Sequence, residues 1–231
     1  MQHPLHNQHV VVIGGTSGIG AAVAVAARQA GCHVTIVGRS AQPIEGVAAV
    51  AADITDHVAM ARALDSVATI DHLVVTAGAR VGSPTLDKLD AEELQLAFDV
   101  KLFGALFAIQ AALPHLARTA SITLTSGVLA RKASAGGLLK GTLNGAIEAA
   151  GRQLAKELAP LRVNLISPGV VDTDLWGAAS DARAATMARI GASLPVGRVG
   201  HAEDLAQAYL AVMSNGFMTG AVIDVEGGAL L

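Results

Sequence analysis

The chain contains seven short runs of β-branched and apolar residues, and helical patterns separate most of them. The runs lie at residues 9–13, 33–37, 47–53, 72–76, 121–125, 162–166 and 221–225. Their near-continuous apolar character is typical of strands that are buried on both faces of a sheet. The helical patterns lie at 18–30, 55–67, 90–117, 137–159 and 201–214. This alternation predicts a Rossmann-like α/β fold, with a doubly wound parallel sheet of about seven strands and helices on both faces.

Composition narrows the classes of protein further. Hydrophobic residues make up 52% of the 231 residues, yet polar residues interrupt every apolar run before it reaches the roughly 18 to 20 residues of a membrane span. The N-terminus lacks the pattern of a signal peptide, so we expect a cytoplasmic protein with no membrane partner. A net charge of −3 without a long basic block argues against nucleic acid as a partner.

No linker or composition break divides the chain, so we expect one domain over residues 1–231. The interval 38–46 is too short for a full crossover helix, and we expect a turn or two of helix there. The single cysteine, Cys32, is expected to be a packed core residue. His3, His6 and His9 could form a metal cluster, but histidines in a polar leader are more typical of solvated chain, so we expect no metal site.

A glycine-rich loop, GGTSGIG at 14–20, follows the first predicted strand and opens a helix. Glycines at 14, 18 and 20 allow the backbone to approach a pyrophosphate, whose charge then lies over the positive end of the helix. The loop also contains Thr16, Ser17 and Ile19. After the second strand, where a dinucleotide fold separates NAD from NADP, the chain reads Gly38, Arg39 and Ser40. Because no carboxylate is present and Arg39 offers donors suited to phosphate, the sequence favours NADP over NAD.

Six motifs in order resemble the short-chain dehydrogenase/reductase family over nearly the whole chain. They are GGTSGIG, AADITD, VTAGA, SITLTSG, RVNLISPGVVDTDL and MTGAVIDVEGG. The resemblance implies an NAD(P)-binding protein that forms a homodimer or homotetramer through the 90–117 and 137–159 helices. It also implies that residues 174–194, with Trp176, form a small substrate lid. The cofactor-binding residues that it implies beyond the loop are Asp53 and Ile54 near the adenine, Ala77 and Gly78 beside the cofactor, and Pro168, Gly169, Val171 and Thr173 at the nicotinamide.

At three of the four positions that correspond to the family's catalytic residues, this chain carries a different residue. By resemblance they carry a helix Asn, a Ser, and a Tyr with a Lys one turn later. Counting back from VNLISPG puts Lys140 at the tyrosine position and Asn144 at the lysine position, while the helix asparagine position reads Lys101. Ser126 remains, although its spacing to Lys140 requires a one-residue gap. The single tyrosine, Tyr209, lies far along the chain, where an aromatic at helical spacing is typical of core.

Lys140 and Asn144 continue one buried face of the 137–159 helix, whose start lies near the carboxyl ends of the strands. A partly desolvated lysine has a weakened preference for its charged form, so Lys140 could donate a proton, or could only hold a cofactor oxygen. Lys101 could supply the missing positive charge from the other wall, and Ser126 could polarise a carbonyl. The loop cations Arg80, Arg131 and Lys132 could favour an anionic substrate or could be solvated.

These patterns predict an NADP(H)-dependent oxidoreductase that exchanges hydride with a small carbonyl or alcohol-type substrate. Its catalytic set would be Ser126, Lys140, Lys101 and Asn144. The alternative is a catalytically silent NADP-binding sensor or scaffold, suggested by an intact cofactor half beside a rewritten catalytic half. A lyase or dehalogenase is less favoured, because this chain has kept its nucleotide loop.

Overall fold

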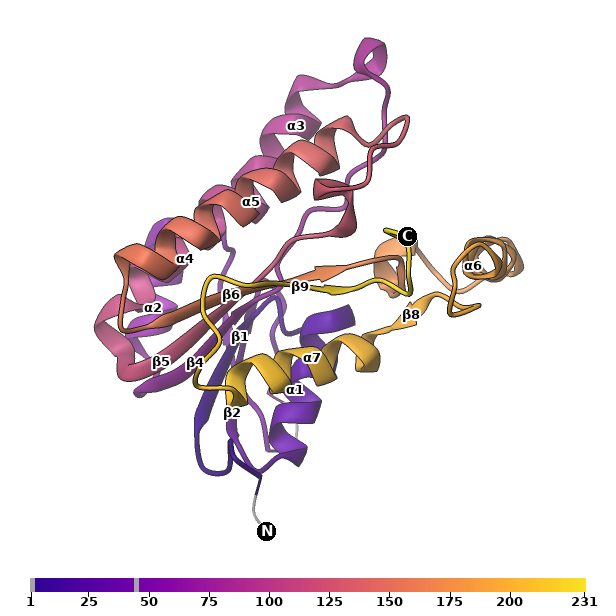
Figure 1. Cartoon of the computed structure of the whole chain (residues 1–231). Helices are drawn as coiled ribbons and strands as arrows, with labels where there is room; N and C mark the ends of the chain where they lie inside the picture. The colour runs from indigo at the N-terminus through magenta and orange to yellow at the C-terminus, as the bar shows by residue number, and fades with distance from the viewer. Residues whose placement is uncertain (1–2, 44–45) are drawn as a thin grey trace.

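A computed structural model describes residues 3–43 and 46–231, and within them a seven-stranded parallel sheet forms the centre of the molecule (Figure 1). The strands lie in the order β3-β2-β1-β4-β5-β6-β9, so the winding reverses between β1 and β4. They are β1 His9–Ile13, β2 His33–Gly38, β3 Ala48–Ala51, β4 Ile70–Val75, β5 Leu116–Thr125, β6 Arg162–Pro168 and β9 Val222–Val225. The predicted doubly wound sheet is confirmed.

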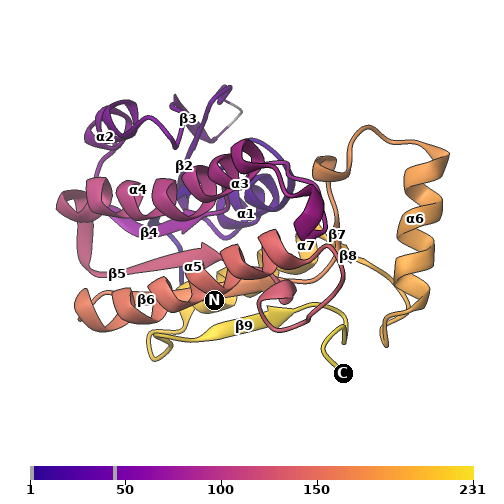
Figure 2. The ribbon, with the colours of Figure 1, turned by 90° about the horizontal axis from the view of Figure 1, so that it is seen from above.

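Helices cover both faces of this sheet (Figure 2). One face packs against α1 Gly18–Gln29 and α7 Ala202–Ser214. The other packs against α2 His57–Asp65, α4 Gly104–Ala112 and α5 Leu138–Glu157. The small alanines of α1 and α4 allow these helices to lie close to the apolar strands, which is why both faces of the sheet are dry.

The pattern at 90–117 predicts one helix, but the structure divides it. Helix α3 covers Ala91–Phe98, a π-helical turn covers Asp99–Phe103, and α4 continues from Gly104. A π turn inserts one extra residue into a helix and is frequent at functional sites. Lys101 lies at the centre of this turn.

The helical stretch Ala91–His115 is long and apolar enough to cross a membrane by length and composition alone. In the fold it belongs to the layer that covers the sheet, and Ala105, Ala108 and Ile109 are buried there. A core helix passes the same composition test, so this stretch is weak evidence for a span.

Two features lie outside the predicted elements. Helix α6, Asp181–Ala192, stands away from the sheet within the 174–194 segment, and Ser180 caps it by accepting a hydrogen bond from the Arg183 amide at 3.2 Å. The short strands β7 Val171–Asp172 and β8 Gly200–His201 pair in parallel between α6 and the sheet (Figure 2). The expected short helix in 38–46 falls partly outside the described residues, and 39–43 within them are turn and irregular chain.

Candidate active site

The carboxyl ends of the parallel strands meet at one edge of the sheet, and the glycine loop lies there. It follows β1 and leads into α1, and Gly14 has a φ of +86°, a region that favours glycine. A Cβ at Gly14 would lie 2.7 Å from the Ala77 nitrogen, so the loop packs directly against the end of β4. Thr76 Oγ1 fastens the two by donating to the Gly14 carbonyl at 3.2 Å.

The start of α1 is open to an anion. Ser17 is the N-cap residue but makes no side-chain capping bond, and no acidic side chain lies in the first turn. The Thr173 side chain approaches from the loop after β6, within 3.4 Å of a Cβ at Gly18. The structure therefore brings Gly18, Ile19 and Gly20 of α1 to one place with Thr173, beside a helix end whose amides favour negative charge.

The expected adenosine side of the site lies after β2 and β3. Arg39 and Ser40 are exposed at the end of β2, and within residues 3–43 and 46–231 no carboxylate pairs with Arg39. Asp53 accepts hydrogen bonds from the Thr55 amide at 3.0 Å and its hydroxyl at 2.9 Å. These bonds, together with the nearby Arg39 charge, lower the pKa of Asp53 below its usual value. The neighbouring Ile54 is buried.

The remaining expected cofactor residues surround the same edge. A Cβ at Gly78 would meet nothing within 4 Å, so this loop borders open space. Gly169 approaches the Glu226 backbone so closely that its Cβ would lie 2.7 Å from the Glu226 Cα. Pro168 ends β6, and Val171 begins β7, which places this turn beside Thr173. These are the features of a cradle for an extended ligand, and they fit a dinucleotide.

Lys101 and Asn144 are in direct contact. The Lys101 ammonium donates to Asn144 Oδ1 at 2.6 Å and to the Ser126 carbonyl at 2.8 Å, and so joins the π turn to α5 and to the end of β5. Burial lowers the pKa of Lys101 to about 8, and the negative charge of Glu148 opposes that shift. A lysine with such a pKa can change its charge near neutral pH.

The Ser126 hydroxyl points to a different partner. Its Oγ donates to Glu148 Oε1 at 2.9 Å, one turn beyond Asn144 on α5, and both side chains are buried. Arg131 donates to both oxygens of Glu148, at 2.9 and 2.8 Å, and also to Ser167 Oγ and to Asp224. Sequence reasoning missed this cluster. The signal for it was a carboxylate four residues after Asn144 on a buried helix face.

Gly127, not Ser126, faces the Asn144 amide. A Cβ at Gly127 would lie 2.6 Å from Asn144 Nδ2. Lys140 comes thirteen positions after Gly127, which removes the one-residue gap that Ser126 requires. The gap was therefore a sequence signal that residue 127, and not Ser126, faces the Asn144 amide.

The Lys140 ammonium does not contact Asn144, although both residues lie on α5. Its Nζ donates to Ser83 Oγ at 3.0 Å, in the loop after β4. Partial burial lowers the pKa of Lys140, and Glu93 opposes this. Tyr209 lies on the opposite face of the sheet, fully buried in α7, with its hydroxyl 2.6 Å from Thr125 Oγ1. Burial raises the pKa of Tyr209 well above its usual value, and the side chain belongs to the core.

The loop cations are all engaged with the protein. Arg80 donates to the Asp174 carbonyl and Lys132 to the Ala229 carbonyl at 2.7 Å, while Arg131 is neutralised by Glu148 and Asp224. Trp176 Nε1 donates to the Val171 carbonyl at 3.0 Å, at the start of the 174–194 segment. An apolar cavity of about 420 Å³ lies between the loops after β4 and β5, next to Lys132 and the start of α5.

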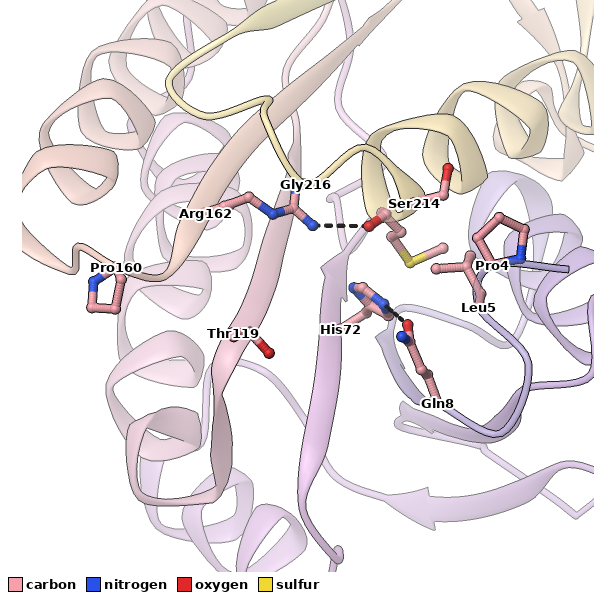
Figure 3. Close-up of a pocket in the computed structure, with 10 residues that line it drawn as sticks. Pro4, Leu5, Gln8, His72, Thr119, Pro160, Arg162, Ser214 and Gly216 are labelled. Carbon is pink, nitrogen blue, oxygen red and sulfur yellow. Dashed lines mark hydrogen bonds between the residues drawn. The ribbon is translucent and has the colours of Figure 1, made fainter.

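A second cavity, of about 360 Å³, lies at the opposite edge, near the amino ends of β4, β5 and β6 (Figure 3). His72 is buried there with its ring nitrogens 2.7 Å from Ser121 Oγ and 2.6 Å from Gln8 Oε1. Burial lowers the pKa of His72 to about 4. Arg162 donates to the carbonyls of Val212 and Met213 at the end of α7 and to that of Met218 in the loop that follows. These polar groups satisfy one another, so they close the fold rather than form a reactive site.

The described residues contain no cluster of three metal-ligating side chains. In the N-terminal segment, His3 accepts from the Leu5 amide and His9 contacts Thr35 and Thr69. Cys32 is buried and donates to the Leu5 carbonyl, and burial raises the pKa of its thiol to about 11.

Comparison with known proteins decides the family. A family model described as enoyl-(acyl carrier protein) reductase matches residues 14–229. A short-chain dehydrogenase/reductase of Stachybotrys chlorohalonatus is 32% identical over 250 residues, covering 98% of each chain. The chain belongs to the short-chain dehydrogenase/reductase family. This is a family of oxidoreductases.

Solved structures of the family match the whole fold. A small-chain dehydrogenase in complex with NADPH superposes with a TM-score of 0.84 at 40% identity, covering 97% of this chain and 99% of that one. The MalC reductase/Diels-Alderase of Malbranchea aurantiaca superposes with a TM-score of 0.87 at 27% identity, covering 99% of this chain and 98% of that one.

Proposed function

We propose that this protein is an NADP(H)-dependent short-chain oxidoreductase that transfers hydride to or from a small carbonyl or alcohol-type substrate, using a nonstandard catalytic set. The observation that carries the proposal is the Lys101 ammonium. It is held by Asn144 and the Ser126 carbonyl at the carboxyl edge of the sheet, near the glycine loop. The residues that we align with the family's tyrosine and lysine are Lys140 and Asn144.

The cofactor would be held by this chain's own loops. The open start of α1, from Gly14 to Gly20, suits the pyrophosphate, and Asp53 suits the adenine amine. Arg39 and Ser40 suit a 2′-phosphate, while the Pro168–Thr173 turn suits the nicotinamide amide. Bound nicotinamide supplies or accepts the hydride. The 40% identical small-chain dehydrogenase was solved in complex with NADPH, which supports NADPH as a cofactor.

Arg39 is expected to set the choice of nucleotide. The substitution Arg39→Glu should weaken NADPH binding at least tenfold, because a carboxylate repels a 2′-phosphate, while NADH binding should change little. The one tryptophan, Trp176, lies beside the Val171 turn, so its fluorescence can report both affinities. Arg62→Glu, on α2, is the matched control. Equal loss of NADPH and NADH affinity would contradict the assignment.

Lys140 is proposed as the proton donor. Lys140 is half-buried and its ammonium donates to Ser83, and the next residues in each segment, Gly141 and Pro84, line the 420 Å³ cavity. Lys140→Ala should lower the rate of NADPH oxidation with a responsive carbonyl compound at least tenfold, since positioning of the cofactor retains part of the rate without an acid. Lys156→Ala, exposed near the far end of the same helix, is the control. Unchanged turnover in Lys140→Ala would contradict the assignment of Lys140 as proton donor.

A broad panel of carbonyl, imine and alkene compounds tests the function as a whole. Oxidation of NADPH with at least one member is the expected result. Tight binding of NADPH without turnover on any member would favour a silent nucleotide sensor, and absence of binding would defeat both readings.

The lid and the oligomer are also part of the proposal. Residues 174–194 would act as the substrate lid of one domain spanning 1–231, because η5 Asp174–Trp176 directly follows the turn at Val171–Thr173 and α6 stands away from the sheet (Figure 2). Phe103, Phe107 and Leu113 expose about 40% of their surface along the α4 stretch, and Leu138 is exposed at the start of α5. This apolar face would be covered in a homodimer or homotetramer of a cytoplasmic protein.

A further inference from the structure

Lys101 and Asn144 lie on two neighbouring helical segments and are in direct contact. By the resemblance to the family, position 144 would carry a lysine and position 101 an asparagine, whereas this chain carries Asn144 and Lys101. Because an ammonium can only donate, its 2.6 Å contact requires the amide oxygen of Asn144 to face Lys101. The Asn144 amide nitrogen is thereby turned toward Gly127.

Gly127 leaves the space that this arrangement needs. Its φ is 170°, an extended conformation that any residue adopts, so backbone strain does not require glycine here. The requirement is steric: a Cβ would lie 2.6 Å from Asn144 Nδ2 and 3.2 Å from its Cγ. A side chain at 127 and the present Asn144 rotamer therefore exclude each other.

Glu148 is linked to the Lys101 ammonium through Ser126. Its carboxylate lies one turn after Asn144 and holds the Ser126 hydroxyl, while the Ser126 carbonyl accepts from Lys101. The ammonium, the amide and the strand end are thus linked by bonds that leave Asn144 little freedom to move away from position 127.

We propose that Lys101, Gly127 and Asn144 form one interdependent unit that presents the ammonium to the cofactor site from the α3–α4 turn instead of from α5. This inference rests on the proposed function for its link to NADPH, but not for the interdependence itself. Gly127 and Asn144 are positioning residues within the unit.

The steric dependence between Gly127 and Asn144 is tested by measuring the Tm of unfolding, without any cofactor. Gly127→Ala should lower the Tm by about 3 to 8 °C, because overpacking a buried site is destabilising. In an Asn144→Ala background the same substitution should change the Tm by less than about 2 °C. Gly145→Ala is the control, since a Cβ there meets nothing within 4 Å and alanine favours helix. Equal losses of Tm on Gly127→Ala in the unchanged protein and in Asn144→Ala would contradict the proposal that the two residues depend on each other.

The charge half is tested by NADPH binding. Lys101→Asn and Asn144→Lys should each raise the Kd at least tenfold, the first by removing the charge and the second by setting two ammonium groups together. The combined exchange should return the Kd to within about threefold of the unchanged protein. Additive losses would overturn the proposal. If the unchanged protein binds no NADPH, the proposed function fails, while the Tm comparison still decides the interdependence.

Discussion

Replacing Arg131 by alanine is expected to lower the free energy of unfolding by about 3 to 5 kcal/mol, because the Glu148 carboxylate is left buried without its cation. The side chain of Glu148 is 7% exposed and takes two hydrogen bonds from Arg131. The Ser126 hydroxyl alone cannot compensate a full charge in that position. Denaturant titration followed by far-UV circular dichroism measures the loss.

Arg152 provides a matched control for this prediction. It approaches the same Glu148 oxygen, at 4.0 Å, but its side chain is 53% exposed. Arg152→Ala should cost no more than about 0.5 kcal/mol, as exposed pairs do. The combined Arg131→Met and Glu148→Leu variant should recover most of the loss, because it removes the buried charge, while the Ser126 and Ser167 hydroxyls lose only a neutral share of their hydrogen bonding. A loss in Arg131→Ala no larger than in Arg152→Ala would show that the buried pair contributes little.

The strands and most helices could be predicted because their residues follow the periods of buried sheet and amphipathic helix. Strand β1 begins and ends where the pattern predicts, and α1 and α7 differ from it by one residue at an end. The π turn at Asp99–Phe103 could not be predicted, because one inserted residue leaves the apolar pattern of a long helix nearly unchanged. Helix α6 was missed because its segment was read only as a lid, although Ser180 is a capping signal.

The site was harder to predict where a shift of one residue along the chain reverses the direction of a side chain. Consecutive residues of an extended chain face opposite sides, so a one-residue offset exchanges cleft and interior. Ser126 was expected at the cleft, but its hydroxyl contacts Glu148, and Gly127 is the residue that faces the Asn144 amide. The glycine loop carried no such ambiguity, because its glycines must lie where the strand turns into the helix.

The Arg131–Glu148 cluster lay beyond sequence reasoning for another reason. Its members come from a loop, a helix and the ends of two strands, and Asp224 lies 93 residues after Arg131. Only the topology brings the ends of β6 and β9 next to each other. A charged loop residue is usually solvated, so nothing local distinguished Arg131 from its neighbour Lys132.

Lys101 is expected to have the largest effect on activity. Lys101→Met should lower kcat/KM for NADPH at least 100-fold, since the charge near the cofactor is lost and Asn144 loses the partner that orients its amide. Lys156→Met, near the end of α5, is the control. Lys101→Arg should retain more activity than Lys101→Met, because a guanidinium keeps the charge. A drop of less than tenfold in Lys101→Met would show that the ammonium is not part of the working site.

The pH dependence separates a loss of this charge from a loss of structure. Burial lowers the pKa of Lys101 to about 8, so kcat/KM should fall about tenfold per pH unit above pH 8, and Lys101→Arg should move that fall to higher pH. The folded pKa lies below the usual 10.5, so the unfolded chain holds the extra proton between these values. The contribution of Lys101 to stability therefore rises with pH from about 8 to 10.5. We therefore expect kcat/KM to fall across this pH interval while the protein stays folded. Circular dichroism at each pH measures whether it is folded. An alkaline limb that persists in Lys101→Arg but disappears in Lys140→Ala would transfer the titrating role to Lys140.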